Sequence, residues 1–170
     1  ASTRSLAGVV AEICQASGVT DYDVSELYGI VRGYADAEGG TARSALQPLM
    51  LAYGFDAIER EGTLVFRSRT GKAGELIEAE KLAVSPEAST DLLTIRAPEA
   101  EVAGRLRLSY IEADAEFATR AEEAVFPDEA THAISQTELP LVLTRTEAGG
   151  IAERWLAEAR VARDTAKFAL

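Results

Sequence analysis

The sequence is poor in the residues on which most metal and redox sites depend. It has one cysteine, Cys14, and one histidine, His132, among 170 residues. A single cysteine cannot form an intramolecular disulfide, so the sequence gives no indication of export to an oxidising compartment. A single histidine cannot form a zinc site without thiolate or carboxylate help. We therefore expect no metal and no cofactor.

Aromatic residues and long apolar runs are also scarce. Aromatics make up 6% of the chain and hydrophobic residues 47%, so the core must consist mainly of Leu, Val, Ile and Ala. No apolar run approaches the roughly 20 residues that span a bilayer, and no secretory signal is visible. The length suits one sizeable domain or two small ones.

Basic residues are outnumbered by acidic ones. The chain has 17 Lys and Arg against 28 Asp and Glu, which gives a formal net charge of -11. A nucleic-acid surface needs clustered cations that displace counterions, and an anionic membrane surface attracts cations as well. We therefore expect no nucleic-acid contact and no membrane insertion by this domain.

The first 70 residues have the pattern of two helices and a hairpin. Apolar residues at helical spacing predict a helix over residues 6–14, capped by Ser2 or Ser5 and ended by Gly18. Thr41 is suited to cap a second helix that Gly54 ends, with Pro48 inside it expected to bend or restart the helix. Residues 24–27 are interpreted as a short helical turn and residues 30–34 as a strand. Residues 55–60 and 63–67 then predict a hairpin around Glu61-Gly62.

The rest of the chain is richer in strand patterns. Residues 105–111 alternate, with Leu106, Leu108 and Tyr110 expected to face inward. Residues 117–126 and 133–139 predict two further strands. Thr144 and Glu147 form a capping box for a C-terminal helix whose glycines, Gly149-Gly150, either allow close backbone packing or are simply tolerated.

These patterns predict an α+β protein with two subdomains. A helix–hairpin subdomain covers residues 1–70, a linker residues 71–91, and a β-rich, barrel-like subdomain with one long helix residues 92–170. The chain starts at Ala1 and ends in what looks like an interrupted strand. We therefore expect a fragment of a larger protein whose second subdomain continues further.

Three neighbouring carboxylates, Glu112, Asp114 and Glu116, are the strongest candidates for hydrolytic chemistry or a cation site. Residues spaced two apart share a face only in an extended segment, and this stretch lies between two predicted strands. A calcium loop would need more Asp or Asn and a glycine at its sharp turn. A solvated turn is the favoured interpretation.

Other candidate residues have simpler explanations. Cys14 and Trp155 lie on the apolar faces of predicted helices and are interpreted as core residues. His132 lacks a Gly-x-Ser-x-Gly partner motif and is interpreted as a surface or capping residue. Gly39-Gly40 precedes a helix but lacks the lysine of a phosphate loop. Arg32, Arg43, Arg105 and Arg107 form no contiguous basic stripe. We assign no catalytic, cofactor-binding or metal-binding residue.

Several short motifs follow one another along the chain. They are Gly18-Val19-Thr20-Asp21, Val31-Arg32-Gly33-Tyr34, Ala52-Tyr53-Gly54-Phe55-Asp56, Glu61-Gly62-Thr63-Leu64-Val65-Phe66, Arg105-Leu106-Arg107-Leu108-Ser109-Tyr110-Ile111 and Ala152-Glu153-Arg154-Trp155-Leu156. Together they resemble the hub domain of phage tail-tip and baseplate proteins. The order and spacing are most similar to the large tail protein of alphaproteobacterial gene transfer agents, in which a phage-tail-type domain follows a TIM-barrel-like domain.

The resemblance implies a structural role without catalytic residues. Such hubs connect the tail tube to the distal, host-contacting parts, usually as a trimeric ring. The implied partners are other tail and baseplate proteins, with a homotrimer in the full-length assembly. The implied location is assembly in the cytoplasm and then the tail tip of a phage-like particle.

Two alternatives remain open at this point. One is a cell-wall hydrolase that acts through Glu112, Asp114 or nearby carboxylates. The other is an adaptor that binds envelope peptides or carbohydrates without turnover. We also expect the isolated chain to be monomeric, because contacts in such rings are spread over the whole parent protein.

Overall fold

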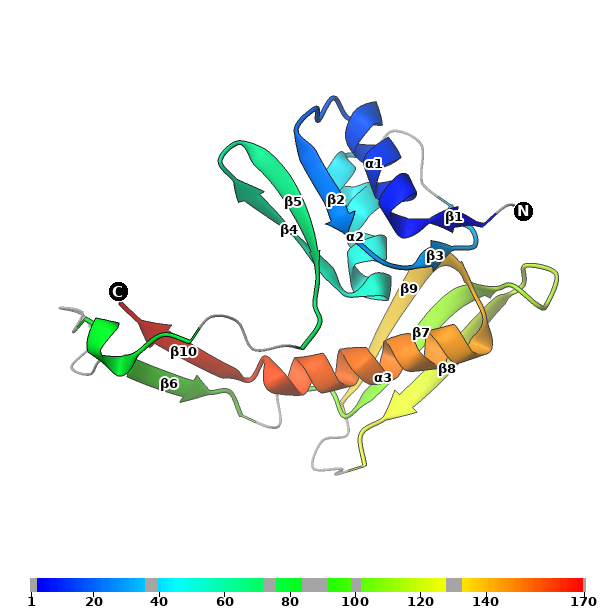
Figure 1. Ribbon diagram of the computed structural model, residues 1–170. Helices are drawn as coiled ribbons and strands as arrows, with labels where there is room; N and C mark the ends of the chain where they lie inside the picture. The colour runs from blue at the N-terminus through cyan, green and yellow to red at the C-terminus, as the bar shows by residue number, and fades with distance from the viewer. Residues whose placement is uncertain are drawn as a thin grey trace.

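The computed structural model describes residues 3–35, 40–71, 76–83, 92–98, 102–127 and 133–169. Two short helices cover one small sheet, a second sheet packs against a long third helix, and a two-stranded ribbon extends away from both (Figure 1). This combination of helices with separate open sheets confirms the α+β class. The sheets do not close, so the described strands of the second part form no barrel.

The two N-terminal helices begin and end as the sequence predicts. Helix α1 (Leu6–Ala16) has Ser5 as its cap, whose hydroxyl accepts from the Gly8 amide at 3.1 Å. Helix α2 (Ala42–Tyr53) is capped by Thr41 and ends at Gly54 in the left-handed conformation. Each cap oxygen satisfies an amide that has no partner inside the helix.

Pro48 does not interrupt α2. The helix is continuous through it, so the restart does not occur, and the other expected effect, a bend at Pro48, stays a prediction. A proline inside a helix removes one backbone hydrogen bond and costs about 3 kcal/mol. The helix persists because its apolar stripe is buried in the core at Ala45, Leu46, Leu49 and Ala52.

The interpretation of residues 24–27 as a helical turn is wrong. They belong mostly to strand β2 (Tyr22–Glu26), which pairs in parallel with strand β5 (Thr63–Ser68). A four-residue segment has too little local preference to hold a helix, and the free edge of β5 provides backbone partners for an extended chain. Tertiary pairing therefore decides this segment.

Strand β4 (Phe55–Arg60) and β5 form the predicted hairpin. Its two turn residues, Glu61 and Gly62, have φ of 50° and 84°. Positive φ at both central positions is the geometry that matches the twist of a two-residue hairpin. The resulting sheet has the order β2-β5-β4.

The strand expected over residues 30–34 is divided between two partners. Strand β3 (Ile30–Val31) pairs with strand β1 (Arg4–Ser5). Three residues later, Tyr34 bridges Leu141 in the second sheet, and the Ala35 amide donates to the Pro140 carbonyl. This short segment therefore joins the two halves of the chain through backbone hydrogen bonds.

The second sheet has the order β8-β7-β9. Strand β7 (Arg105–Glu112) runs antiparallel to strand β8 (Thr119–Val125) and parallel to strand β9 (Ile134–Leu143). Leu106, Leu108 and Tyr110 are buried, which confirms the alternation read from the sequence. Strand β9 extends four residues beyond the predicted end, through Pro140.

Helix α3 (Arg145–Val161) has the predicted capping box. The Thr144 hydroxyl accepts from the Glu147 amide at 3.2 Å, and the Glu147 carboxylate accepts from the Thr144 amide at 2.8 Å. A side chain added at Gly149 or Gly150 would meet nothing within 4 Å. The glycine pair therefore does not serve close packing and is simply tolerated.

A ribbon formed by strand β6 (Leu92–Arg96) and strand β10 (Asp164–Phe168) projects from the end of α3 (Figure 1). A short 3-10 helix, η1 (Ala79–Lys81), lies beside it, and Ala83 bridges Ala169. All ten strand residues of the ribbon are exposed, and none belongs to the hydrophobic core.

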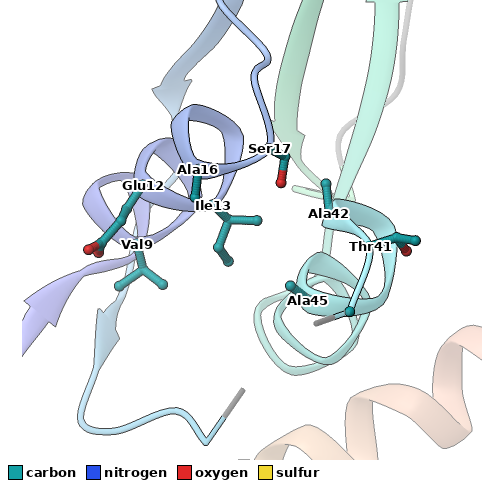
Figure 2. Close-up of a pocket in the computed structure, with 9 residues that line it drawn as sticks. Val9, Glu12, Ile13, Ala16, Ser17, Thr41, Ala42 and Ala45 are labelled. Carbon is teal, nitrogen blue, oxygen red and sulfur yellow. The ribbon is translucent and has the colours of Figure 1, made fainter. Parts of the chain in front are cut away.

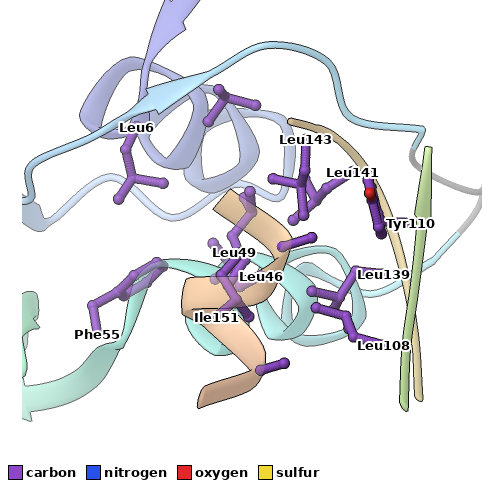
Figure 3. Packing of buried hydrophobic residues seen from close by; sticks show 14 of the residues in the cluster. Leu6, Leu46, Leu49, Phe55, Leu108, Tyr110, Leu139, Leu141, Leu143 and Ile151 are labelled. Carbon is purple, nitrogen blue, oxygen red and sulfur yellow. The ribbon is translucent and has the colours of Figure 1, made fainter. Parts of the chain in front are cut away.

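One core serves both halves of the chain. Leu6, Leu49 and Phe55 from the first 70 residues lie in the same cluster as Leu108, Leu141 and Ile151 from the later part (Figure 3). The division into residues 1–70 and 92–170 with a linker at 71–91 stays a prediction.

Candidate functional site

The carboxylates of the acidic turn lie in different surroundings. Glu112 closes β7 and forms an ion pair with Arg120 of β8 at 3.3 Å. Asp114 and Glu116 are exposed in the following turn. Across the residues that the structure describes, no group of three or more His, Cys, Asp or Glu side chains is placed to hold a metal ion.

The other candidates are buried or fall outside the described residues. Cys14 is buried in α1, and desolvation raises the pKa of its thiol, which disfavours the nucleophilic thiolate. Trp155 is partly buried and packs against the core. His132 and Gly39 lie outside the described residues, so the structure does not place them.

A hollow lies between α1 and α2 (Figure 2). It has a volume of about 350 Å³ and is lined by Val9, Glu12, Ile13, Ala16, Ser17, Gly40, Thr41, Ala42 and Ala45. Its single charged side chain, Glu12, pairs with Arg4. Of its polar side chains, Glu12 is held by Arg4 and the Thr41 hydroxyl caps α2, so both are already engaged within the chain.

A polar junction joins the two halves at the end of α2. One terminal nitrogen of Arg154, on α3, donates to the carbonyls of Leu51 at 2.8 Å and Ala52 at 2.7 Å. These carbonyls belong to the last turn of α2, where no further helical amide reaches them. Burial lowers the pKa of Arg154, while Glu158 at 3.5 Å favours its charged form.

Arg69 extends the same junction. It pairs with Glu158 of α3 at 2.8 Å and with Asp56 of β4 at 3.5 Å. The hairpin, the end of α2 and the middle of α3 are thereby joined by charged groups. This arrangement holds the three elements in a fixed orientation.

A second junction lies at the start of α3. The Arg32 guanidinium donates to both carboxylate oxygens of Glu147 at 3.1 and 3.2 Å. Partial burial by itself raises the pKa of Glu147, but the hydrogen bonds from Arg32 and Thr144 outweigh it and hold the pKa below its ordinary value. The Tyr53 hydroxyl donates to the Ile30 carbonyl at 2.9 Å, and burial raises its pKa to about 12.

Sequence reasoning did not find these junctions. Arg32 and Arg154 belong to two of the motifs that carry the family resemblance, but neither these motifs nor the residues around Arg69 predict a contact with a distant element. Their partners lie 115, 89 and 103 residues away along the chain, so no local spacing signals the contacts. Only the fold brings them together.

The most unusual surface is the projecting part of the chain, which we call the arm. It consists of residues 76–83, 92–98 and 163–169. Its large apolar side chains are exposed: Leu76 86%, Ile77 40%, Leu92 49%, Leu93 40%, Ile95 44% and Phe168 47%. Contiguous exposed apolar residues usually mark an interaction site. The arm is therefore the best candidate for a functional surface.

Comparison with known proteins identifies the family. The family described as "Putative phage tail protein", Phage-tail_3, matches residues 41–170. The chain belongs to this phage tail protein family. The resemblance inferred from the sequence motifs is thus confirmed, and the role that the family indicates is a structural one in a tail.

A solved structure of the native gene transfer agent virion contains a similar chain. It is 56% identical over 99% of this chain, with a TM-score of 0.93. This chain spans only 38% of that chain's length. A search of curated proteins finds no match.

Two crystal structures of tail proteins share the fold at low identity. The tail protein of Neisseria meningitidis MC58 is 12% identical, with a TM-score of 0.63, over 96% of this chain and 49% of its own. The 43 kDa tail protein of prophage MuSo2 from Shewanella oneidensis is 16% identical, with a TM-score of 0.55, over 97% and 49%. Among the described helices of our chain, none is long and apolar enough to cross a membrane.

Proposed function

We propose that this chain is a structural module of the tail-tip or baseplate hub of a gene-transfer-agent-like particle. In this role it connects the tail tube to the distal parts that contact the host. The observation that carries the proposal is the match to a chain of the native virion at 56% identity and a TM-score of 0.93. Likeness at this level over 99% of the chain favours the same place in the same kind of particle.

The described surface agrees with an architectural role. The charged groups at both junctions hold elements of the chain to one another. In the acidic turn, Glu112 is engaged in an ion pair with Arg120. No observation favours the hydrolase or the envelope-binding adaptor, and we propose a non-enzymatic module.

The proposed partners are other tail and baseplate proteins and further copies of the same protein. In the full-length assembly we propose a homotrimer, without nucleic-acid contact or membrane insertion by this domain. Assembly takes place in the cytoplasm, and the finished protein belongs to the tail tip. With a net charge of -11, an isolated chain repels its own copies, so we expect it to be monomeric.

Mass spectrometry of purified particles tests this proposal. Particles from cells that encode the protein should yield its peptides at a few copies per particle, against many copies of the tube protein. Cryo-electron microscopy of the same particles should place it at the distal end of the tube. Consistent absence from intact particles, or a position along the whole tube, would overturn the hub assignment.

The hydrolase alternative has its own measurement. The unmodified chain should clear no peptidoglycan in a turbidity assay. If it did, Glu112→Gln and Asp114→Asn would show whether those carboxylates cause the clearing, and the architectural proposal would need revision.

A further inference from the structure

Strand β8 is the outer strand of its sheet, and one of its two backbone edges has no partner. Among the described strands it bonds only to β7 (Figure 1). Within the described part of the chain, no further hydrogen bond engages the backbone of Thr119–Val125. In an antiparallel pair, alternate residues bond to the neighbouring strand, so the amides and carbonyls of the intervening residues point away from β7. These seven residues are therefore a template for one more strand.

A second hollow opens at the end of β8, between that strand and α3. It has a volume of about 280 Å³, and its lining residues are Ala124, Val125, Phe126, Pro127, Glu153 and Leu156. Ala124 and Leu156 are buried, whereas Glu153 is exposed, so the hollow reaches from the core to the surface. Its walls are mostly apolar and offer a seat for an aliphatic side chain.

An added strand would bring a side chain to this hollow. Successive side chains of a strand point to opposite faces, and Ala124 lies on the buried face of the sheet with its partner Leu106. A residue added opposite Ala124 points to that same face, where the hollow lies. Recognition by strand addition combines main-chain hydrogen bonds with pockets for alternate side chains, and the edge and the hollow supply both.

The charges around the hollow indicate the chemistry of the added segment. The charged side chains of β8 are already paired within the chain, as Arg120–Glu112, Glu122–Arg145 and Glu123–Arg105. The Arg160 guanidinium lies over the Phe126 ring, 3.7 Å from its centroid. Glu153, in contrast, takes part in no hydrogen bond or ion pair in the part of the chain that the structure describes. A carboxylate beside an apolar hollow favours a segment with a cation near its apolar side chain, and the net charge of -11 attracts such a segment from a distance.

We propose that the edge of β8 and this hollow form a binding site for an extended segment of another tail protein. The segment adds to β8 as a strand and seats an aliphatic side chain in the hollow. A lysine or arginine two positions away, on the same face of the segment, pairs with Glu153. The inference takes the kind of partner from the proposed function, while the binding itself can be measured without the particle.

Binding of synthetic peptides to the purified chain is the first test. The probe is a short capped peptide of alternating threonine and valine, in which one valine is replaced by leucine and the next valine by lysine. An NMR titration should shift the resonances of β8 and of residues 124–127 and leave those of β4 in place. Replacing the leucine of the peptide by serine should weaken binding about tenfold, because the hollow acts through burial of that side chain. A proline in the middle of the peptide should abolish binding, since it removes a ladder donor.

A charge reversal tests the role of Glu153. We expect Glu153→Lys to bind the lysine peptide about fivefold more weakly, and to bind a peptide with glutamate in place of lysine more tightly than the unmodified chain does. Glu59→Lys makes the same charge change on β4 and should alter neither affinity by more than about twofold. Both variants should melt within a few degrees of the unmodified chain, which shows that they fold. Equal effects of the two variants would contradict a contact with Glu153.

Photocrosslinking in purified particles identifies the natural segment. A photoreactive amino acid is placed at Val125 on β8 or, as a matched control, at Ile58 on β4, where both native side chains are 45% exposed. We expect the β8 position to crosslink to a segment of another tail protein that has an aliphatic residue and a cation two positions apart, and the β4 position not to crosslink to it. A crosslink to a second copy of this chain, or to a segment without that pattern, would overturn the assignment.

The outcomes separate this inference from the proposed function. No peptide binding at millimolar concentration, together with no crosslink from position 125 in particles that contain the protein, overturns the β8 site and leaves the hub role intact. Specific peptide binding by a chain that is consistently absent from particles retains the binding site and overturns the hub role.

Discussion

At the scale of single residues, the fold depends on a few arginines that bind groups far away in the sequence. The Arg154 guanidinium donates to two carbonyls in the last turn of α2, which have no partner inside that helix. The Arg32 guanidinium donates to the Glu147 carboxylate, which is also part of the capping box of α3. These contacts orient the two halves of the chain around their common core.

Arg154→Ala tests the first of these contacts. The variant leaves the Leu51 and Ala52 carbonyls without their charged donor, so we expect a loss of about 2 kcal/mol in the free energy of unfolding. Arg43→Ala, which removes an exposed arginine at the start of α2, is the control and should change stability by less than about 0.5 kcal/mol. Urea denaturation measures both, and equal losses would contradict a special role for Arg154.

Glu147→Gln tests the second contact through its dependence on pH. The pKa of the Glu147 carboxylate is lower in the folded protein than its ordinary value of 4.5 in the unfolded chain. The ionised carboxylate therefore stabilises the fold fully at pH values above 4.5, and this stabilisation is lost as the pH falls through the folded pKa. Glutamine still suits a capping box, so the variant removes mainly the charge. We expect it to be less stable by about 1 kcal/mol at pH 7, because the partly exposed pair is screened by solvent.

That difference should shrink as the pH falls below 4.5 and the unmodified protein loses its own advantage. Denaturation curves of both proteins at pH 7 and at several acidic values provide the measurement. A difference that stays constant with pH would show that the charge of Glu147 is not the cause.

At the scale of elements, local signals explain most helices and the hairpin, and pairing partners explain the rest. Capping residues placed α1, α2 and α3 correctly, and positive φ at Glu61 and Gly62 closes the hairpin. Strand β2 was not predicted, because its conformation depends on β5, about forty residues further along the chain.

Two glycine substitutions compare a turn with a helix. Gly62 has a φ of 84°, so Gly62→Ala should destabilise the protein by about 1–2 kcal/mol through backbone strain alone, since its new side chain meets nothing within 4 Å. Gly149 lies in a helix with the same open space, so Gly149→Ala should stabilise it by about 0.8 kcal/mol. Thermal melts of both variants should shift in opposite directions, and shifts of the same sign would contradict this explanation.

At the scale of the whole molecule, a shared core makes the two halves depend on each other. Buried side chains from α1, α2 and the hairpin lie in one cluster with those from β7, β9 and α3 (Figure 3). Backbone bonds between Tyr34–Ala35 and Pro140–Leu141 add to this connection. The arm lies outside the cluster.

We expect the isolated chain, apart from the arm, to unfold in one cooperative transition. Fluorescence of Trp155, on α3, and circular dichroism of all helices should give the same midpoint, because removal of one half exposes the core of the other. Hydrogen exchange should be fast in β6 and β10 and slow in β7, since the arm strands are exposed and outside the core. Two separate transitions would support the predicted division at residues 71–91.

The sequence by itself determined the α+β class, the helix caps, the hairpin turn, the inward face of β7 and, through its ordered motifs, the phage tail family. These features depend on near neighbours in the chain, which a sequence displays directly. Only the tertiary structure decided the strand conformation of β2, the core shared by the two halves, the arginine junctions and the exposure of the arm. Each of these depends on groups that lie far apart in the sequence and meet only when burial of the common core brings them together.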